Sequence, residues 1–219
     1  MNGAYDFSFC DLTLTALPQG ALWVGDHRAL CVSDLHLGKS DRIARRSGRM
    51  LPPYETRATL EKLDALIAVL DPGMVICLGD SFDDLDAAQS LSDTDHLHMA
   101  TLQAGRDWVW IEGNHDPGPV NLSGRHLAEL TLGPLAFRHI ATQEKGEISG
   151  HYHPKCGLAG GGTRPAFLID TDRIIMPAFG TYTGGLRANH PALRALMSPQ
   201  AHAVLTGRKA MAVPLKAVV

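Results

Sequence analysis

The sequence lacks the features of a membrane protein, a secreted protein or a CxxC metal site. No apolar run approaches the length that spans a bilayer, and the first residues hold no basic stretch followed by an apolar one. The four cysteines are scattered, and Cys10, Cys31 and Cys77 lie in apolar runs, as buried thiols do. We therefore expect a cytoplasmic protein with reduced cysteines and no membrane partner.

An overall positive charge is also lacking. The formal net charge is -3, so no global basic field argues for nucleic acid. The charge is uneven, however: residues 38–57 hold six basic and two acidic side chains, whereas residues 79–95 hold six aspartates and no Lys or Arg. Two such segments suit a site that binds both metal cations and a polyanion.

The pattern of apolar residues predicts an α/β fold. With 219 residues, 45% of them hydrophobic, and no repeat or linker, residues 1–219 are expected to form a single domain. Strands are predicted at 7–14, 21–24, 29–32, 74–78, 108–111, 127–132, 135–137, 148–149, 166–169, 174–176 and 210–213. Helices are predicted at 57–70, at 94–104 and from near Pro191, turns at 25–28 and 133–134, and a glycine loop at 160–162. This order favours a two-sheet β-sandwich flanked by helices.

Five short patches of metal-binding side chains follow one another along the chain. They are Asp34-Leu35-His36, Gly79-Asp80, Gly113-Asn114-His115-Asp116, His139 and Gly150-His151-Tyr152-His153. Each stands beside a glycine or just after a predicted strand, where α/β folds place their chemistry. Carboxylate, amide and imidazole ligands without thiolates suit Mn²⁺, Fe or Zn²⁺ rather than Ca²⁺. Together the patches predict a dinuclear metal site for phosphoester hydrolysis.

Spacing within the patches gives a first geometric expectation. In an extended segment, residues two positions apart point the same way, so Asp34 and His36 should reach one ion. The same reasoning places two imidazoles on one side of the segment that holds His151 and His153. A carboxylate at Asp80 could bridge two cations.

Three further side chains need a choice between a structural and a functional interpretation. A lone histidine is usually a satisfied core or surface residue, but the position of His139 between a predicted strand and Gly150-His151 favours a ligand. Asp83 and Asp84 are either partners of the ligands or surface carboxylates, and the sequence leaves both open.

The patches resemble the calcineurin-like metallophosphoesterase superfamily, whose pattern is DxH, GD, GNH(D/E), a lone His and GHxH in this order. The resemblance implies a four-layer αββα sandwich with two bound divalent metal ions. It implies that Asp34, His36, Asp80 and His153 hold the first metal, and that Asp80, Asn114, His139 and His151 hold the second. It also implies that His115 stays free of metal and faces the leaving group, with Asp116 orienting it.

Several stretches are similar, more narrowly, to the bacterial ligase-associated DNA damage response phosphoesterases, the PdeM-like family. These stretches are residues 34–39, 78–82, 150–154 and 177–186. The resemblance implies a Mn²⁺-favouring phosphodiesterase or nuclease, with Fe or Zn²⁺ as alternative metals. It also implies DNA repair beside an ATP-dependent DNA ligase and a helicase, and it allows a homodimer.

A basic strip follows the first patch directly. Arg42, Arg45 and Arg46 at helical spacing are either a solvated helix face or guanidinium groups at the rim of the cleft. In the second case they would hold the phosphates that flank the scissile one. We predict the substrate-binding role.

Three functions compete. The first is a metal-dependent phosphodiesterase or nuclease acting on DNA or RNA. The second is a small-molecule phosphodiesterase or pyrophosphatase acting on cyclic nucleotides or nucleotide conjugates, which the negative net charge keeps open. The third is a non-catalytic metal-binding scaffold, which is disfavoured because such descendants typically lose ligands or the acid histidine.

Overall fold

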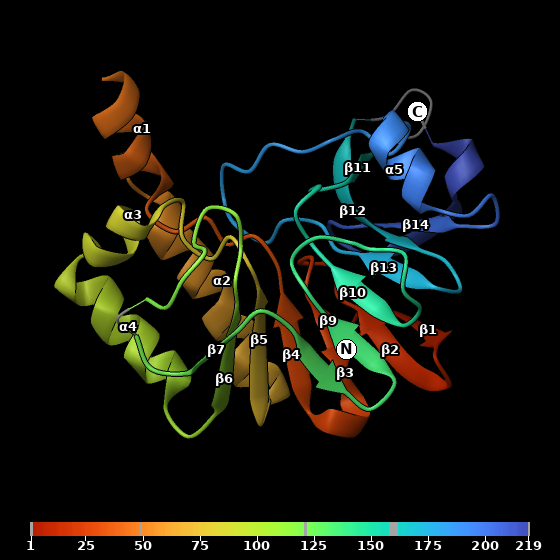
Figure 1. The fold of residues 1–219 in the computed structure, drawn as a ribbon, viewed down its shortest axis with the longest axis horizontal. Helices are drawn as coiled ribbons and strands as arrows, with labels where there is room; N and C mark the ends of the chain where they lie inside the picture. Colours follow the sequence, from red (N-terminus) through yellow and green to blue (C-terminus); the bar gives the residue numbers. More distant parts are fainter. Residues whose placement is uncertain (1, 49, 121, 158–161, 219) are drawn as a thin grey trace.

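Two mixed β-sheets face each other, and helices cover their outer sides (Figure 1). The computed structural model describes residues 2–48, 50–120, 122–157 and 162–218. The layer order is αββα, as predicted. Within the described ranges, no helix combines the length and the apolar character that crossing a bilayer requires.

The first sheet has the strand order β1-β2-β3-β4-β5-β6-β7. Its strands are β1 (Tyr5–Phe9), β2 (Leu12–Ala16), β3 (Leu22–Val24), β4 (Ala29–Val32), β5 (Met74–Leu78), β6 (Asp107–Ile111) and β7 (Arg125–Leu127). Strands β1 to β4 form an antiparallel meander, whereas β4 to β7 run parallel. The carboxyl ends of the parallel strands therefore lie at one edge of the sheet.

The second sheet has the order β15-β14-β12-β13-β10-β9-β8, with β11 paired to β12. Its strands are β8 (Leu130–Leu132), β9 (Leu135–Phe137), β10 (Glu147–Ser149), β11 (Lys155–Cys156), β12 (Arg164–Ile169), β13 (Arg173–Ile175), β14 (His202–Leu205) and β15 (Met211–Pro214). Strands β9, β10 and β13 are parallel to one another, and the other pairs are antiparallel.

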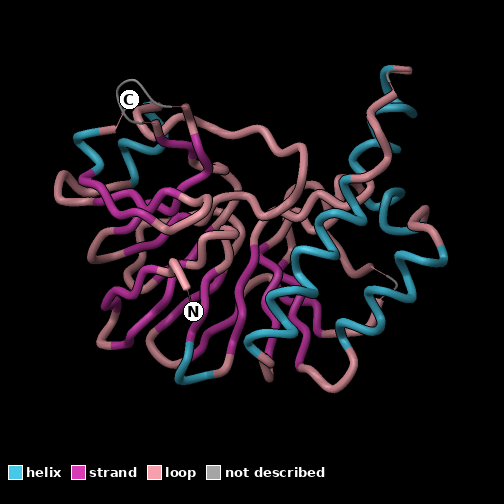
Figure 2. Tube along the Cα trace, turned by 180° about the vertical axis from the view of Figure 1, so that it is seen from behind, coloured by secondary structure: helices cyan, strands magenta, loops and turns pink. Residues whose placement is uncertain are grey.

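The helices form the two outer layers. They are α1 (Lys39–Ser47), α2 (Glu55–Leu70), α3 (Leu85–Gln89), α4 (Asp93–Gln103) and α5 (Pro191–Leu196), with 3-10 turns η1 (Gly25–His27) and η2 (Leu215–Ala217). Helices α2 and α4 lie over the first sheet and α5 lies over the second, while α1 projects from the body of the protein (Figures 1 and 2).

Alternation along the strands separates three apolar clusters. In β4, Ala29 and Cys31 join the core between the sheets, whereas Leu30 and Val32 pack with the helices. The core between the sheets also holds Ile76, Val109, Phe137, Ile148, Phe167 and Ile174. The two outer clusters hold Leu60, Leu63 and Ile67 of α2, and Leu193 of α5.

The predicted elements differ from the structure at a few places. The run at 7–14 is two strands, because Cys10 and Asp11 have φ of 51° and 62° and turn the chain back. The run at 127–132 is also two strands, since the chain crosses there from β7 in the first sheet to β8 in the second. The pattern does not predict β14, and residues 160 and 161 of the predicted glycine loop lie outside the described residues.

Candidate metal centre and active site

Loops from both sheets meet at one edge. Those after β4, β5 and β6 carry Asp34, His36, Asp80 and Asn114, and those after β9 and β10 carry His139, His151 and His153. The first two loops run side by side, because the His36 amide donates to the Asp80 carbonyl at 2.9 Å. The last two are joined by the Gly150 amide, which donates to the His139 carbonyl at 3.0 Å. All seven predicted metal ligands therefore share one edge of the sandwich.

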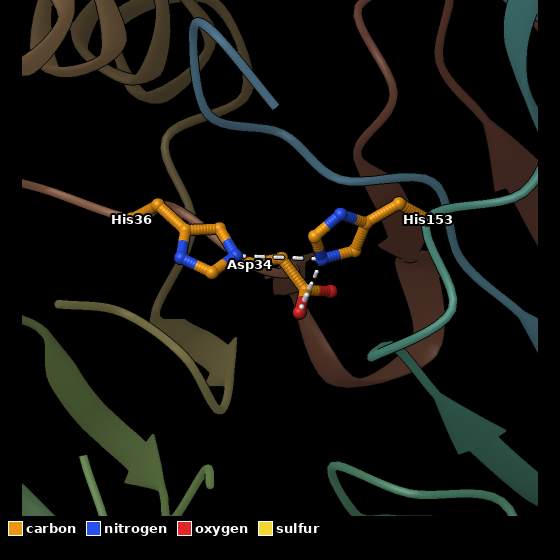
Figure 3. Close-up of side chains that lie close together, drawn as sticks. All are labelled: Asp34, His36 and His153. Carbon is orange, nitrogen blue, oxygen red and sulfur yellow. Dashed lines mark hydrogen bonds and ion pairs between the residues drawn. The ribbon is translucent and has the colours of Figure 1, made fainter. Parts of the chain in front are cut away.

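Asp34, His36 and His153 form a first cluster of donor atoms (Figure 3). His153 Nε2 lies 3.0 Å from Asp34 Oδ1 and 3.4 Å from His36 Nε2. The Asp34 side chain is wholly buried, and it also accepts hydrogen bonds from the Ser33 hydroxyl and, at 3.1 Å, from the His151 amide. In Figure 3 the two imidazoles approach each other from opposite sides above the carboxylate.

A second cluster contains Asp80, His139 and His151. His139 Nε2 lies 3.4 Å from Asp80 Oδ2 and 3.2 Å from His151 Nδ1. Asn114 Oδ1 joins the group, 3.0 Å from His139 Nε2. The other ring nitrogen, His139 Nδ1, lies 2.9 Å from the Leu78 carbonyl, so it donates there and leaves Nε2 to face the cluster.

The ionisable groups of the second cluster depend on one another. Burial would lower the pKa of His139, but the carboxylates of Asp80 and Asp34 raise it to about 9. Burial would raise the pKa of Asp80, yet its hydrogen bond and charge interaction with His139 bring it to about 2. Burial and the charge on His139 together lower the pKa of His151. The ionised carboxylates of Asp80 and Asp34 therefore favour a bound proton or cation in the second cluster.

The donor atoms fit divalent cations. Two pairs of imidazole nitrogens lie 3.4 Å and 3.2 Å apart, and their lone pairs repel unless a proton or a cation lies between them. Ligands about 2.1 Å from one ion stand at separations of roughly this size. Imidazole, carboxylate and amide donors suit the borderline to hard divalent metals. Binding of cations would also release the proton that His139 holds.

The backbone of the ligand loops is not extended. Left-handed φ values occur at Asp34 (52°), His36 (47°), Asp80 (46°), His151 (67°) and His153 (46°). The expectation that Asp34-Leu35-His36 and His151-Tyr152-His153 are extended segments is therefore wrong, and the two histidines of the last patch enter different clusters. Such conformations cost about 1–3 kcal/mol each and persist only where the surroundings enforce them.

Asp83, which the sequence left undecided, is a buried partner of the ligands. Its Oδ1 lies 2.8 Å from His36 Nδ1, and its Oδ2 lies 2.8 Å from Arg42 Nη1. Burial opposes its ionisation, but these hydrogen bonds and the charge of Lys39 hold its pKa well below the usual range. Asp83 therefore orients the His36 ring with Nε2 toward the first cluster.

His115 and Asp116 are adjacent to the clusters but do not bond as predicted. His115 Nδ1 lies 2.8 Å from the Asp83 carbonyl, and its Nε2 lies 4.0 Å from Asp80 Oδ2. The Asp116 carboxylate instead accepts hydrogen bonds of 2.8 to 3.1 Å from the amides of Asp80, Ser81, Phe82 and Gly113. The Asp83 carbonyl, not Asp116, orients His115. Burial raises the pKa of Asp116 to about 6, with the charge on Asp80 adding to this and the amides opposing it.

The predicted basic strip forms α1, next to the first cluster. Two guanidinium groups of this strip form ion pairs within the protein. Arg42 pairs with Asp83, and Arg45 Nη2 lies 2.8 Å from Asp84 Oδ1. Arg46 is exposed on the same helix. The substrate-binding role of the three arginines stays a prediction, and the ion pairs show why the acidic segment faces the basic one.

Residues 177–186 form a strap that passes over the first cluster, and the sequence did not reveal its role. The Gly180 amide donates to the Asp34 carbonyl at 3.1 Å, and the Leu186 amide donates to the Tyr152 carbonyl at 3.1 Å. Lys62 of α2 donates to the Phe179 carbonyl, and its Nζ lies 3.6 Å from the centroid of the Phe179 ring. Burial lowers the pKa of Lys62 to about 8. The strap thus ties the loops of both sheets to α2.

The fold and the donor set define the chain as a metal-dependent phosphodiesterase. A model of the calcineurin-like phosphoesterases matches residues 27–175, more than half of the chain, so the protein belongs to the calcineurin-like phosphoesterase family. The chain is also similar to the crystal structure of the Pseudomonas putida nuclease MPE, with 27% sequence identity and a TM-score of 0.77. The match covers 96% of this chain and 100% of that one. No curated protein matches the sequence. These findings confirm the superfamily and agree with the narrower PdeM-like placement.

Because the strap lies close to the Asp34 loop, adding a single methyl group at Gly180 should lower the stability of the protein. In Gly180→Ala the new carbon would lie 2.0 Å from the Leu35 carbonyl oxygen. Overpacking of this kind costs about 1–3 kcal/mol, which lowers Tm by roughly 2–4 °C per kcal/mol in a protein of this size. We expect a lower Tm in calorimetry and less bound metal by mass spectrometry. Gly184→Ala is the control, since nothing lies within 4 Å of its new carbon, and equal behaviour of the two variants would contradict the strap's role.

Proposed function

We propose that this protein is a nuclease that hydrolyses phosphodiester bonds in DNA with two divalent metal ions, Mn²⁺ being preferred over Fe or Zn²⁺. The observation that carries the proposal is the pair of donor clusters at one edge of the sandwich, with Asp80 in the second cluster and His115 beside it. The similarity to a nuclease over 96% of the chain supports a nucleic acid substrate. Residues 1–219 would act as one domain, since β1 to β3 continue the first sheet ahead of the matched range.

The chain's own residues would hold the metals and orient the reacting groups. Asp34, His36, Asp80 and His153 would hold the first ion, and Asp80, Asn114, His139 and His151 the second. When bound, the two ions supply Lewis acidity that activates water and neutralises charge on the phosphate. Asp83 orients His36, and the Asp116 carboxylate fixes the Asp80 loop through its four amide hydrogen bonds.

His115 would be the general acid. Its Nδ1–H donates to the Asp83 carbonyl, so Nε2 is the atom that can deliver a proton, and the side chain keeps 27% of its surface exposed. Protonation of the departing alkoxide is the step that His115 would assist, because an alkoxide is a poor leaving group at neutral pH.

We extend the proposal to the biological context that the resemblance implies. The protein would work in DNA repair beside an ATP-dependent DNA ligase and a helicase, in the cytoplasm, and it could form a homodimer. The stretches at 34–39, 78–82, 150–154 and 177–186 support this placement. The cysteines Cys10, Cys31, Cys77 and Cys156 are free thiols, as a reducing compartment requires.

A small-molecule phosphodiesterase is the second candidate, because Arg42 and Arg45 are engaged with Asp83 and Asp84 and leave less free positive charge for a long polyanion. Hydrolysis of a 5′-labelled single-stranded oligonucleotide, measured with Mn²⁺ beside bis-p-nitrophenyl phosphate and cyclic nucleotides, separates the two. Cleavage of the oligonucleotide supports the nuclease. Turnover of the small diesters alone contradicts it.

Replacing His115 tests the general acid. His115→Ala should retain its metal content and lose about 10²–10⁴-fold in turnover of DNA. The loss on bis-p-nitrophenyl phosphate should be much smaller, because nitrophenolate departs without a proton. Steady-state rates on both substrates and metal analysis give the result. His98→Ala is the control, since that side chain is similarly exposed, at 26%, and lies on α4. Equal losses on both substrates would argue against proton donation.

Replacing exposed arginines of α1 tests the phosphate contact. In Arg45→Ala/Arg46→Ala, the slope of log kcat/KM on DNA against log salt should become shallower by about one to two units, since each lost phosphate contact removes about one. The variant Arg194→Ala on α5 should keep the wild-type slope. An unchanged slope in the double variant would mean that α1 is a solvated helix that does not contact the phosphates of the substrate.

A further inference from the structure

A hollow of about 360 Å³ opens beside the second cluster. It is lined by Glu112, Gly113, Asn114, Pro117, Ala128, Arg138, His139 and Ile140, and we call it the Ile140 hollow. Asn114 and His139 belong to the second cluster, so the hollow begins where the proposed reaction takes place. Its volume lies in the range of sites that hold small ligands.

The charged side chains around the Ile140 hollow disfavour the binding of a phosphate. Among the described residues that line it, Arg138 is the only Lys or Arg, and its guanidinium lies 2.7 Å from both Glu129 and Glu144 and 3.6 Å from Glu147. Glu112 adds a negative charge to the lining. Away from His139 and the metal it would hold, a second phosphate of a substrate would meet no unpaired Lys or Arg in the lining, so an uncharged group fits the hollow better.

The walls favour a flat, partly apolar group. Pro117, Ala128 and Ile140 present apolar atoms, and Ile140 keeps 43% of its surface exposed directly after His139. Two polar groups of the lining lie outside the second cluster: the Glu112 carboxylate can accept an N–H, and the buried Arg138 Nε has no hydrogen-bond partner within the described part of the chain. Apolar walls with a few polar groups that fix orientation are the make-up of a small-ligand site.

We propose that the Ile140 hollow binds the base of a nucleotide next to the phosphodiester that is cleaved. The inference rests on the proposed nuclease function and deepens it. In a nucleic acid, the uncharged group one sugar away from a phosphate is a base, which offers a flat apolar face and polar edges. A base in this hollow positions its own phosphate over Asn114 and His139. The hollow would therefore contribute to the rate on nucleotide substrates and nothing to diesters that carry no base.

Two chromogenic diesters with one leaving group separate these effects. Thymidine 5′-p-nitrophenyl phosphate carries a base, and methyl p-nitrophenyl phosphate does not. The wild-type protein with Mn²⁺ should have the higher kcat/KM on the thymidine ester. Ala128→Trp, at an exposed position, should fill the hollow and lower kcat/KM on the thymidine ester about tenfold or more. The methyl ester should change by less than about twofold.

A smaller change and matched controls complete the experiment. Ile140→Ala should remove one wall and lower kcat/KM on the thymidine ester alone by severalfold. Ala68→Trp and Leu97→Ala make the same changes at exposed positions of α2 and α4, and both should behave as wild type. In metal-free protein, the fluorescence of an oligonucleotide that contains 2-aminopurine should be quenched on binding, and less so in Ile140→Ala.

Each outcome decides one claim. Equal losses on both esters, no loss on either, or a wild-type protein that does not prefer the thymidine ester would overturn the base subsite. If wild-type protein with Mn²⁺ hydrolyses the methyl ester but no variant affects base recognition, the phosphodiesterase function stands and only the subsite falls. If it hydrolyses neither ester and does not cleave DNA, the proposed function itself falls, and the subsite with it.

Discussion

The carboxylate of Asp34 is the point at which the loops of the two sheets are joined. It lies at the end of β4 and is wholly buried, yet it accepts the amide of His151 at 3.1 Å and faces His153 Nε2 at 3.0 Å, both from the loop after β10. This approach leaves no space for a side chain at Gly150, where a Cβ would lie 1.8 Å from the Ser33 hydroxyl. The Asp34 carboxylate therefore holds the loop after β10 of the second sheet close against the loop after β4 of the first.

The ligand loops bring together several unfavourable contributions to the free energy of folding, which the rest of the fold must offset. Buried carboxylates, facing imidazoles and five left-handed ligand residues each raise the free energy of the native state. Asp83 and Asp116 offset part of this cost through hydrogen bonds to His36 and to the amides of the Asp80 loop. Bound cations would offset more, which links metal affinity to folding stability.

The sequence predicts the layers and the ligand set because both depend on short-range patterns. Apolar runs predict β4 to β6 and α2, and the ordered motifs from Asp34 to His153 select the side chains that meet at the edge. What the sequence did not predict depends on contacts between distant segments. The partner of His115 is a backbone carbonyl, the strap acts through amides, and the left-handed turns follow from close packing between loops. Residue types alone do not predict any of these three features.

The order in which the segments of the chain are synthesised bears on the assembly of the first cluster and the strap. The first sheet needs only residues 5–127, and in the first cluster it supplies Asp34 and His36. His153 and the strap at 177–186 come later along the chain, and contacts between such distant segments form late in folding. A nascent chain that has folded its first sheet therefore carries only part of the donor set. The full set of metal ligands for phosphodiester hydrolysis is therefore complete only after the segment that holds His153 has been synthesised and has packed against the first sheet.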